Sequence, residues 1–227
     1  MKKFGFAAAA AIAFATISTS AVAADGQFFV DGGIGRSSYS LSGDPYYNDK
    51  TDWSTSIRAG FMWHGFVDYG LELGYVDLGQ AVKRDRLTLA LPTGTWSYYS
   101  RYSTAANGWL LGGRLEYVIG QSWYLMARGG WFRPRITEKN SEWEDRPWAG
   151  PWEPLLGARY GHVQASFGTG TQSYFGLGIG YCISRHWRAG LNYDYYGLGS
   201  LAQDGFYNTA QAASHVKTYS ASIQYRF

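Results

Sequence analysis

Five charged residues stand in otherwise small or apolar segments, and their side chains are suited to form an internal site. They are Arg58, Glu72, Arg114, Glu116 and Arg128. Arginine and carboxylate groups form charge-assisted hydrogen bonds, often with two parallel contacts. Charges removed from water are stable only when they are paired or hydrated. The mixture of signs therefore predicts an ion-pair network, provided that the chain encloses these positions.

The histidines, which are the commonest general bases, do not form a recognisable catalytic set. His162 and His215 fall near Ser214 at one predicted end of the fold, and His64 and His186 fall at the other. None of them shows the spacing of a nucleophile, a base and an orienting acid. Dispersed histidines and a single cysteine also predict no metal site. We therefore expect a protein that is not an enzyme and has no cofactor.

Two other binding classes are not supported by the sequence. Gly176, Gly178 and Gly180 look like a phosphate loop, but no predicted helix follows them as nucleotide binding requires. Without the two lysines near the N-terminus, 18 of the 20 basic residues remain against 17 acidic ones. This balance predicts no nucleic-acid partner, because such a partner needs a concentrated basic face.

The N-terminus has the composition of an export signal. Lys2 and Lys3 precede an apolar stretch from Phe4 to about Ile17, and small residues then lead to an A-x-A site at 21–23. This order predicts a signal peptide over residues 1–23, cleaved after Ala23 or alternatively after Ala24, with a membrane anchor as the other interpretation. The remaining residues 24–227 are enough for one domain.

The elements that must position the charges are β-strands, because residue types alternate with a period of two. In the segment 53–63, Ile57 and Phe61 lie on one face while Ser56 and Arg58 lie on the other. Its length matches the roughly 9–11 residues of a tilted membrane strand. The same pattern recurs, which predicts eight strands near residues 28–34, 53–63, 69–75, 109–117, 123–131, 175–182, 187–194 and 219–227.

Eight alternating strands predict an all-β fold, a closed antiparallel up-and-down transmembrane β-barrel. A soluble barrel is the structural alternative. Aromatic residues at the strand ends favour the membrane, because Trp and Tyr suit the depth of lipid headgroups. We expect two such aromatic girdles, formed by Trp53, Trp63, Tyr69, Tyr75, Trp109, Tyr117, Trp123, Trp131, Tyr181, Trp187, Tyr193 and Tyr219.

The connections alternate between short and long. Turns near His64, Gln121 and Arg185 are short, and we expect long extracellular loops over 39–52, 78–107, 134–171 and 197–215. Residues 87–102 look like a hairpin above the membrane; if that hairpin spans the bilayer, the barrel has ten strands. A first hairpin centred near Gly65 would place Arg58 opposite Glu72.

Several strand motifs resemble a known family when their order is considered. They are YGLELGY at 69–75, LGGRLEY at 111–117, RGG at 128–130, GLNYDY at 190–195 and YRF at 225–227. Together they resemble the eight-stranded domain of the outer membrane protein A and opacity-protein superfamily, over roughly half of the mature chain. The resemblance implies a barrel in the outer membrane of a Gram-negative bacterium, in contact with lipid and lipopolysaccharide.

The C-terminus also resembles a known signal. Ile223, Tyr225 and Phe227 are similar to the pattern recognised by the outer-membrane assembly machinery. An ordinary last strand ending in a girdle aromatic is the alternative, and the two can hold together. The assembly machinery is therefore an expected partner.

The function has to lie in the interior charges or in the long loops. A narrow eight-stranded interior is about filled by side chains, which favours a structural plug over a gated pore. One loop carries Trp143, Arg146, Trp148 and Trp152, residue types that are common at binding hot spots. We therefore expect a structural and surface-recognition role, adhesin-like, with a host or surface ligand. A narrow porin-like channel for small or hydrophobic solutes is the alternative, and a lipid-modifying enzyme comes third.

Overall fold

The computed structural model describes residues 26–40, 49–91, 94–145, 161–168, 170–200 and 213–227. Most of them lie in β-strands, which suits their alternating aromatic, branched and small side chains. In chain order the strands are β1 (Gly26–Ser40), β2 (Thr51–Trp63), β3 (Asp68–Leu91), β4 (Gly94–Ile119), β5 (Trp123–Asp145), β6 (Gly161–Gly168), β7 (Gln172–Cys182), β8 (Trp187–Ser200) and β9 (Ala213–Arg226).

Eight of these strands form a closed ring of antiparallel neighbours. The pairing runs from β1 to β5 in chain order, passes from β5 to β7, and continues through β8 to β9. β1 also pairs with β9, from Phe29 opposite Arg226 to Ser40 opposite His215, which closes the ring. The short strand β6 pairs with the outer part of β5, outside the ring. The predicted eight-stranded closed barrel is confirmed.

Successive residues of each strand face opposite sides of the ring. The side chain of Phe28 is 50% exposed and that of its neighbour Phe29 only 1%. The same contrast separates Leu71 (59%) from Glu72 (1%). Large apolar side chains thus cover the outside, whereas the interior holds the charged side chains together with small, apolar and aromatic ones. A continuous apolar exterior of this kind suits lipid rather than water.

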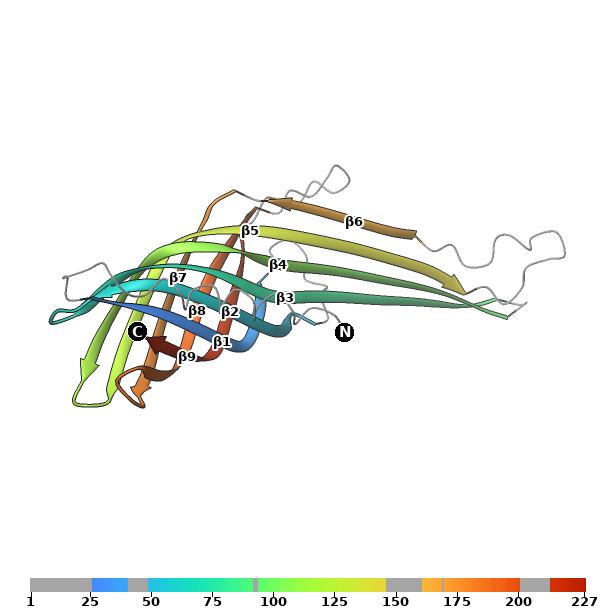
Figure 1. The fold of residues 1–227 in the computed structure, drawn as a ribbon. Coiled ribbons are helices and arrows are strands. Elements are labelled where there is room, and N and C mark those ends of the chain that lie inside the picture. The colour runs from blue at the N-terminus through green and yellow to red at the C-terminus, as the bar shows by residue number, and fades with distance from the viewer. Residues whose placement is uncertain (1–25, 41–48, 92–93, 146–160, 169, 201–212) are drawn as a thin grey trace.

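The ring has two different ends. At the short-turn end, residues 64–67, 120–122 and 183–186 connect β2 to β3, β4 to β5 and β7 to β8. At the far end, β3, β4 and β5 continue well beyond the other strands of the ring (Figure 1). Residues 80–91 pair with 94–105, and residues 97–107 pair with 135–145 without a break in register. Residues 80–91, 94–105 and 137–145, together with β6, are called the projecting sheet below.

The projecting sheet corrects the predicted loops. Residues 78–91, 94–107, 134–145 and 161–168 are strand within the segments 78–107 and 134–171. The hairpin predicted near 87–102 extends β3 and β4 and adds no new pair of strands to the ring. The predicted loops 39–52 and 197–215 are also shorter, because β8 reaches Ser200 and β9 begins at Ala213. Charge and glycine suggested loops here, whereas each strand finds a neighbour to complete its hydrogen bonds.

The register of the first hairpin differs from the prediction by two residues. Arg58 lies opposite Gly74, and Glu72 lies opposite Gly60. The last pair of this hairpin is Trp63 with Tyr69, whose rings stack with centroids 5.5 Å apart. The turn therefore occupies residues 64–67 and is centred beyond Gly65. Among the described residues, no helix is long and apolar enough to cross a membrane.

Candidate functional site

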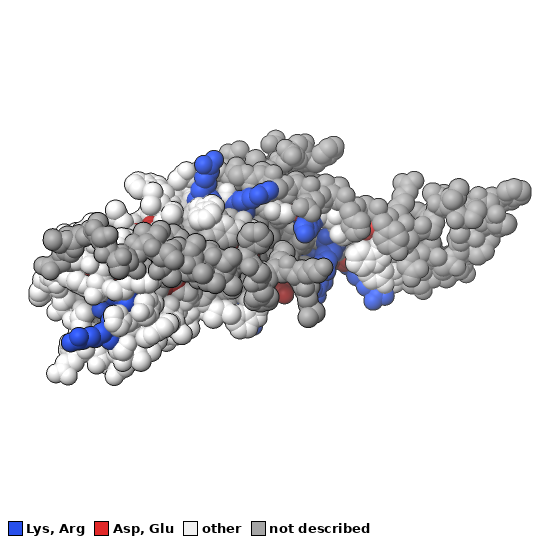
Figure 2. Space-filling model, viewed as in Figure 1, with Lys and Arg blue, Asp and Glu red and all other residues white. Residues whose placement is uncertain are grey.

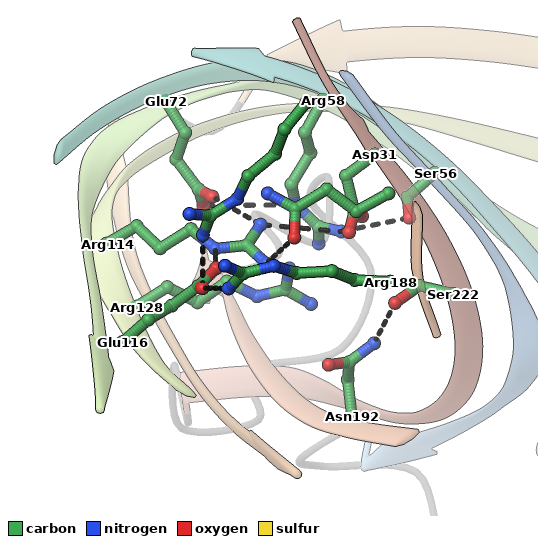
Figure 3. Close-up of polar contacts among 12 residues, drawn as sticks. Asp31, Ser56, Arg58, Glu72, Arg114, Glu116, Arg128, Arg188, Asn192 and Ser222 are labelled. Atoms are coloured by element: carbon green, nitrogen blue, oxygen red, sulfur yellow. Dashed lines mark hydrogen bonds and ion pairs between the residues drawn. The ribbon is translucent and has the colours of Figure 1, made fainter. Parts of the chain in front are cut away.

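Among the residues that the structure describes, ten charged side chains in the barrel interior form what is called the ionic layer. The five charged residues singled out in the sequence belong to it, and each is at most 4% exposed. Figure 3 shows their guanidinium and carboxylate groups pointing toward one another across the interior. Five arginines face five carboxylates, so the layer is formally neutral. Its members are Asp31, Arg58, Asp68, Glu72, Arg114, Glu116, Arg128, Arg188, Asp194 and Arg226.

Glu116 is the carboxylate that binds the most arginines in this layer. Arg114 donates from Nε to its Oε1 at 2.8 Å, and Arg188 donates to its Oε2 at 2.6 Å. Arg226 of β9 also donates to Oε2 and lies 3.4 Å from Asp68. One carboxylate of β4 thus ties together arginines of β4, β8 and β9.

The arginines around Glu116 form one centre of the ionic layer, and a second centre, around Asp194, joins β5 to β8. Arg128 holds Asp194 with two hydrogen bonds of 2.7 Å, one from Nε and one from Nη2. Arg58 of β2 lies 3.7 Å from the same carboxylate and donates to the hydroxyl of Tyr196 at 2.7 Å. This centre therefore spans the interior from β2 to β8.

Glu72 links the two centres. Its carboxylate lies 3.9 Å from Arg58 and 3.8 Å from Arg114, and it accepts a hydrogen bond of 2.8 Å from the hydroxyl of Tyr174. Asp31 lies at similar distances, 3.8 Å and 3.7 Å, from the same two arginines. The separations to Arg58 and Arg114 are those of ion pairs without direct hydrogen bonds.

The inward glycines of β7 make room for these contacts. A Cβ at Gly176 would overlap Oδ1 of Asp194, and a Cβ at Gly180 would overlap the ring of Tyr124. At Gly178 a Cβ would come within 2.9 Å of the side chain of Met126. Side chains of β5 and β8 therefore pass over residues 176–180 of β7, a stretch that has only glycines on this face. The glycine pattern is a packing feature, consistent with the sequence argument against a phosphate loop.

An apolar cluster closes the interior toward the far end and is called the apolar layer. Its members are at most 2% exposed: Tyr39, Val76, Leu78, Ala81, Ala106, Leu110, Phe132, Ile136, Tyr174, Tyr196, Leu198 and Val216. Tyr39 anchors it, since its hydroxyl donates to the carbonyl of Gly79 at 2.6 Å and accepts from the N–H of Ala106 at 3.2 Å. Gly79 has φ +70° at the register shift in β3, a conformation that favours glycine.

Between the two layers there is little free space. Gly33, Ser54, Val76, Asp194 and Tyr196 are among the residues that line a cavity of about 10 Å³. Such a cavity has room for about one water molecule.

The residues predicted as aromatic girdles lie on the outer surface of the strands. Near the short-turn end, Trp123 packs against Tyr181 with ring centroids 5.3 Å apart. Near the far end, Tyr75 packs against Trp109 at 5.2 Å, and Tyr193 packs against Tyr219 at 5.1 Å. The others with outward-facing rings are Trp53, Trp63, Tyr69, Tyr117, Trp131 and Trp187.

The C-terminal residues face alternate sides at the seam between β9 and β1. Ile223 and Phe227 are exposed on the outside, and Tyr225 packs against Phe227 with centroids 5.0 Å apart. The N–H of Phe227 donates to the carbonyl of Phe28 at 3.0 Å. Arg226 between them is fully buried. Recognition of this segment by the assembly machinery stays a prediction.

Of the four residues predicted for surface recognition, the structure describes Trp143. Its ring stacks on Tyr99 of β4 with centroids 5.3 Å apart and planes 8° from parallel. The guanidinium of Arg86 lies over the same tyrosine, 5.1 Å from the ring centre. Arg146, Trp148 and Trp152 lie outside the described residues.

The described histidine side chains have separate surroundings. His64 lies 3.2 Å from Asp68, and Nδ1 of His186 lies 2.8 Å from the carbonyl oxygen of Arg226. His215 stacks on Tyr195 at 4.8 Å, and partial burial together with Lys217 lowers its pKa. Within the described part of the chain, no group of three or more His, Cys, Asp or Glu is placed to hold a metal ion.

Sequence reasoning missed half of the ionic layer and all of the apolar layer. Asp31 and Asp194 stand at every second position with the inward-facing residues of their strands, so the period-two pattern of the sequence indicates their burial. Arg188 follows the same pattern, while Asp68 and Arg226 sit at strand ends where burial is hard to predict. Tyr39 and Leu78 lie in segments whose composition predicts loops, and a loop carries no period-two signal that indicates burial.

The chain matches a known protein family, and this match agrees with the fold. The model of the outer membrane protein β-barrel domain family matches residues 7–227. No curated protein matches the chain. Solved structures with a similar fold include Ail, the attachment invasion locus protein of Yersinia pestis, in complex with the heparin analogue sucrose octasulfate. That protein is 12% identical, with 89% of this chain and 99% of that chain covered and a TM-score of 0.43.

Two further solved structures have similar sequence identities and lower TM-scores. The outer membrane protein OprG from Pseudomonas aeruginosa is 12% identical, over 90% of this chain and 97% of that one, with a TM-score of 0.39. The E. coli outer membrane protein W is 13% identical, over 91% and 100%, with a TM-score of 0.32. The family match spans nearly the whole sequence and agrees with the ring of eight strands. The chain therefore belongs to the outer membrane protein β-barrel family, whose members reside in the outer membrane of Gram-negative bacteria.

Proposed function

We propose that this protein is a non-enzymatic surface-recognition barrel whose projecting sheet binds a ligand outside the cell. The observation that carries the proposal is the unbroken continuation of β3, β4 and β5 beyond the ring. Residues 78–91 of β3 extend roughly 45 Å at about 3.3 Å per residue. Closing an eight-stranded barrel does not require such an extension, because β1, β2 and β7 to β9 close it with 11 to 15 residues each.

The interior supports a structural role for the barrel itself. The ionic layer pairs each arginine with at least one carboxylate, and the apolar layer lies between it and the far end. Removing one member of a connected set of buried ion pairs strongly lowers the free energy of unfolding. Two successive layers of side chains favour a plugged barrel over an open pore.

A narrow channel is the second candidate, and one observation favours it. Within the described interior, Asp31 Oδ1, Glu72 Oε2 and Arg114 Nη1 are among the buried polar atoms that make no hydrogen bond. Such atoms are normally hydrated, so water in the ionic layer would be compatible with slow passage of small solutes. The apolar layer argues against conduction at rest, since a passing ion would lose its hydration there.

Shortening the projecting sheet tests the recognition role. Lys83 pairs with Tyr102, so replacing residues 84–101 by Asn-Gly should leave a two-residue hairpin of a favoured type. The full barrel and the shortened variant would be placed in lipid nanodiscs and applied to immobilised glycans and extracellular matrix proteins. We expect the full barrel to bind at least one of these ligands and the shortened variant to lose that binding.

The control is an unchanged barrel. The circular dichroism spectrum and thermal unfolding of the shortened variant should match those of the full barrel, allowing for the residues removed. Equal binding by both proteins, or no ligand for either, would contradict the proposed function.

A further inference from the structure

The two faces of the projecting sheet carry opposite kinds of charge. On β4 every second residue from the outward-facing Trp109 lies on the outer face. The pairing places Arg84, Arg86, Arg101 and Lys139 on that face of the projecting sheet, with Arg135 on the same face at its base. These five exposed residues are called the basic face. The opposite face is the continuation of the side that faces the barrel interior lower on the same strands. It carries Asp85, Glu138 and Glu142 together with Lys83. The near-neutral composition of the chain conceals this separation.

The register brings like charges together on the basic face. Arg84 lies directly opposite Arg101 on the neighbouring strand. Like charges in this position repel each other across a sheet, so the pair concentrates positive charge on one surface. On the face seen in Figure 2, Lys and Arg side chains stand out where the barrel passes into the projecting sheet.

An aromatic row crosses the sheet beside these arginines. Arg86, Tyr99 and Trp143 lie side by side on β3, β4 and β5, in one row of the register. Arg86 covers one side of Tyr99, and Trp143 stacks against that ring as well. The three side chains therefore pack against one another in a row. Trp143, on β5 at one end of this row, lies next to the basic residues of the sheet.

From these features we propose that the basic face binds an anionic polysaccharide, a sugar chain with sulfate or carboxylate groups at regular intervals. Guanidinium groups bind such groups with two parallel hydrogen bonds. Neighbouring cations are separated by about 4.8 Å across strands and about 7 Å along them, as strand geometry dictates. A flat row of this kind fits an extended polymer better than a compact anion. This inference rests on the proposed function and names the chemistry of its ligand.

Location argues against membrane phosphates as the ligand of the outer part of the basic face. Arg86 follows the girdle residue Tyr75 by eleven positions along β3, and Arg101 precedes Trp109 by eight along β4. These separations correspond to roughly 25–35 Å along the strands. Lipid headgroups add only about 5–8 Å to each side of the hydrocarbon core.

The aromatic row argues against single-stranded nucleic acid. Proteins that bind single strands stack bases on open aromatic rings. Tyr99 is already occupied by Arg86 and Trp143, which leaves no such platform at the centre of the row. Single-stranded nucleic acid is therefore expected to bind this face more weakly than an anionic polysaccharide does.

The test measures binding of the full barrel, in nanodiscs of zwitterionic lipid, to dextran sulfate. Unsulfated dextran of the same length and a single-stranded DNA oligonucleotide serve as comparison probes. We expect binding to dextran sulfate, none to dextran, and weaker binding to DNA. The logarithm of the affinity should fall with the logarithm of salt concentration with a slope of about −3.5 to −4.5, as release of counterions by five cations predicts.

A triple variant assigns the binding to the basic face. Replacing Arg86, Arg101 and Lys139 by Gln should weaken binding more than tenfold at low salt and reduce the slope by about 2. The matched control replaces Lys83, Arg185 and Lys217 by Gln, which removes the same charge from other surfaces and should leave affinity and slope near those of the unaltered protein. Trp143→Ala should weaken binding, and Trp143→Phe should largely restore it.

The outcomes separate this inference from the proposed function. Absence of dextran sulfate binding, equal loss in both triple variants, or stronger binding to DNA would overturn the polysaccharide proposal. If the shortened variant nevertheless loses another glycan or matrix ligand, the proposed function stands. If the shortened variant keeps every ligand, the proposed function fails, whatever dextran sulfate does.

Discussion

Arg128 and Asp194 form a two-pronged pair across the barrel interior, with both hydrogen bonds at 2.7 Å. The two residues belong to β5 and β8, which are not neighbours, because β7 lies between them in the ring. Gly176 of β7 lies opposite Arg128 on one side and Asp194 on the other. The pair therefore passes over a strand to connect the two on either side of it.

Breaking this pair should strongly destabilise the barrel. Asp194→Asn leaves Arg128 buried without its main partner, which typically costs about 3–5 kcal/mol of unfolding free energy. Urea titration of the protein in detergent micelles, followed by circular dichroism, would measure the loss. The double variant Arg128→Leu, Asp194→Leu should recover part of it, since no unpaired charge remains. Equal losses for the single and double variants would show that packing, and not charge, dominates.

A side chain at position 176 of β7 should disrupt the pair of Arg128 and Asp194, because the pair passes over this glycine. The added Cβ of Gly176→Ala would overlap the Asp194 carboxylate, and overpacking typically costs about 1–3 kcal/mol. Gly32 offers a matched control on the outer surface, where a Cβ would meet nothing within 4 Å. Gly32→Ala should leave stability unchanged or raise it slightly, by up to about 1 kcal/mol. If both substitutions had the same effect, the crossing pair would not depend on Gly176.

The apolar layer should determine whether the barrel conducts. In planar bilayers the unaltered protein is expected to show no reproducible conductance steps. Leu110→Ala with Phe132→Ala removes two of its largest buried side chains and should produce small steps, because water can then reach the ionic layer. The neighbouring outward residues supply a control, Leu111→Ala with Trp131→Ala, which should stay silent. Clear steps from the unaltered protein would instead establish the channel alternative.

Substitutions of Arg226 and Phe227 should have different effects, one on stability and the other on assembly into the membrane. Phe227 is exposed at the seam, whereas Arg226 is buried between Glu116 and Asp68. Phe227→Ala should lower the amount of protein that reaches the outer membrane in cells and leave refolding into detergent micelles nearly normal. Arg226→Gln should lower the free energy of unfolding by about 3–5 kcal/mol, because Glu116 and Asp68 lose a buried partner. Normal accumulation of Phe227→Ala in the membrane would exclude the assembly role.

The strands and their two faces could be predicted because a barrel wall separates lipid from interior at every second residue. Arg58 and Glu72 could be assigned to the same interior for that reason. Their partners could not, because contacts across a closed ring depend on the stagger of every strand. A shift of two residues in one hairpin moved Glu72 opposite Gly60, while its carboxylate still lies 3.9 Å from Arg58. Long side chains tolerate such a shift, so the cluster was easier to predict than its pairs.

The projecting sheet was harder to predict, because its charges resemble those of a solvated loop. Arg84 and Arg86 alternate with Lys83 and Asp85, so neither face is apolar and the period-two signal disappears. Pairing with neighbouring strands supplies the order that hydrophobic burial does not. The separation of charge between its faces becomes visible only when the register of all three strands is known.

The unbroken strands also have a mechanical consequence. A ligand that pulls on the tip of the projecting sheet pulls along the axes of β3, β4 and β5, which continue directly into the barrel wall. Their hydrogen bonds to β2 and β7 in the wall would then be strained in shear, many at once, and would not open one by one as in a peeling hairpin. A cell held by this sheet would therefore be anchored through the whole wall, and the attachment should withstand flow that would tear away a flexible loop.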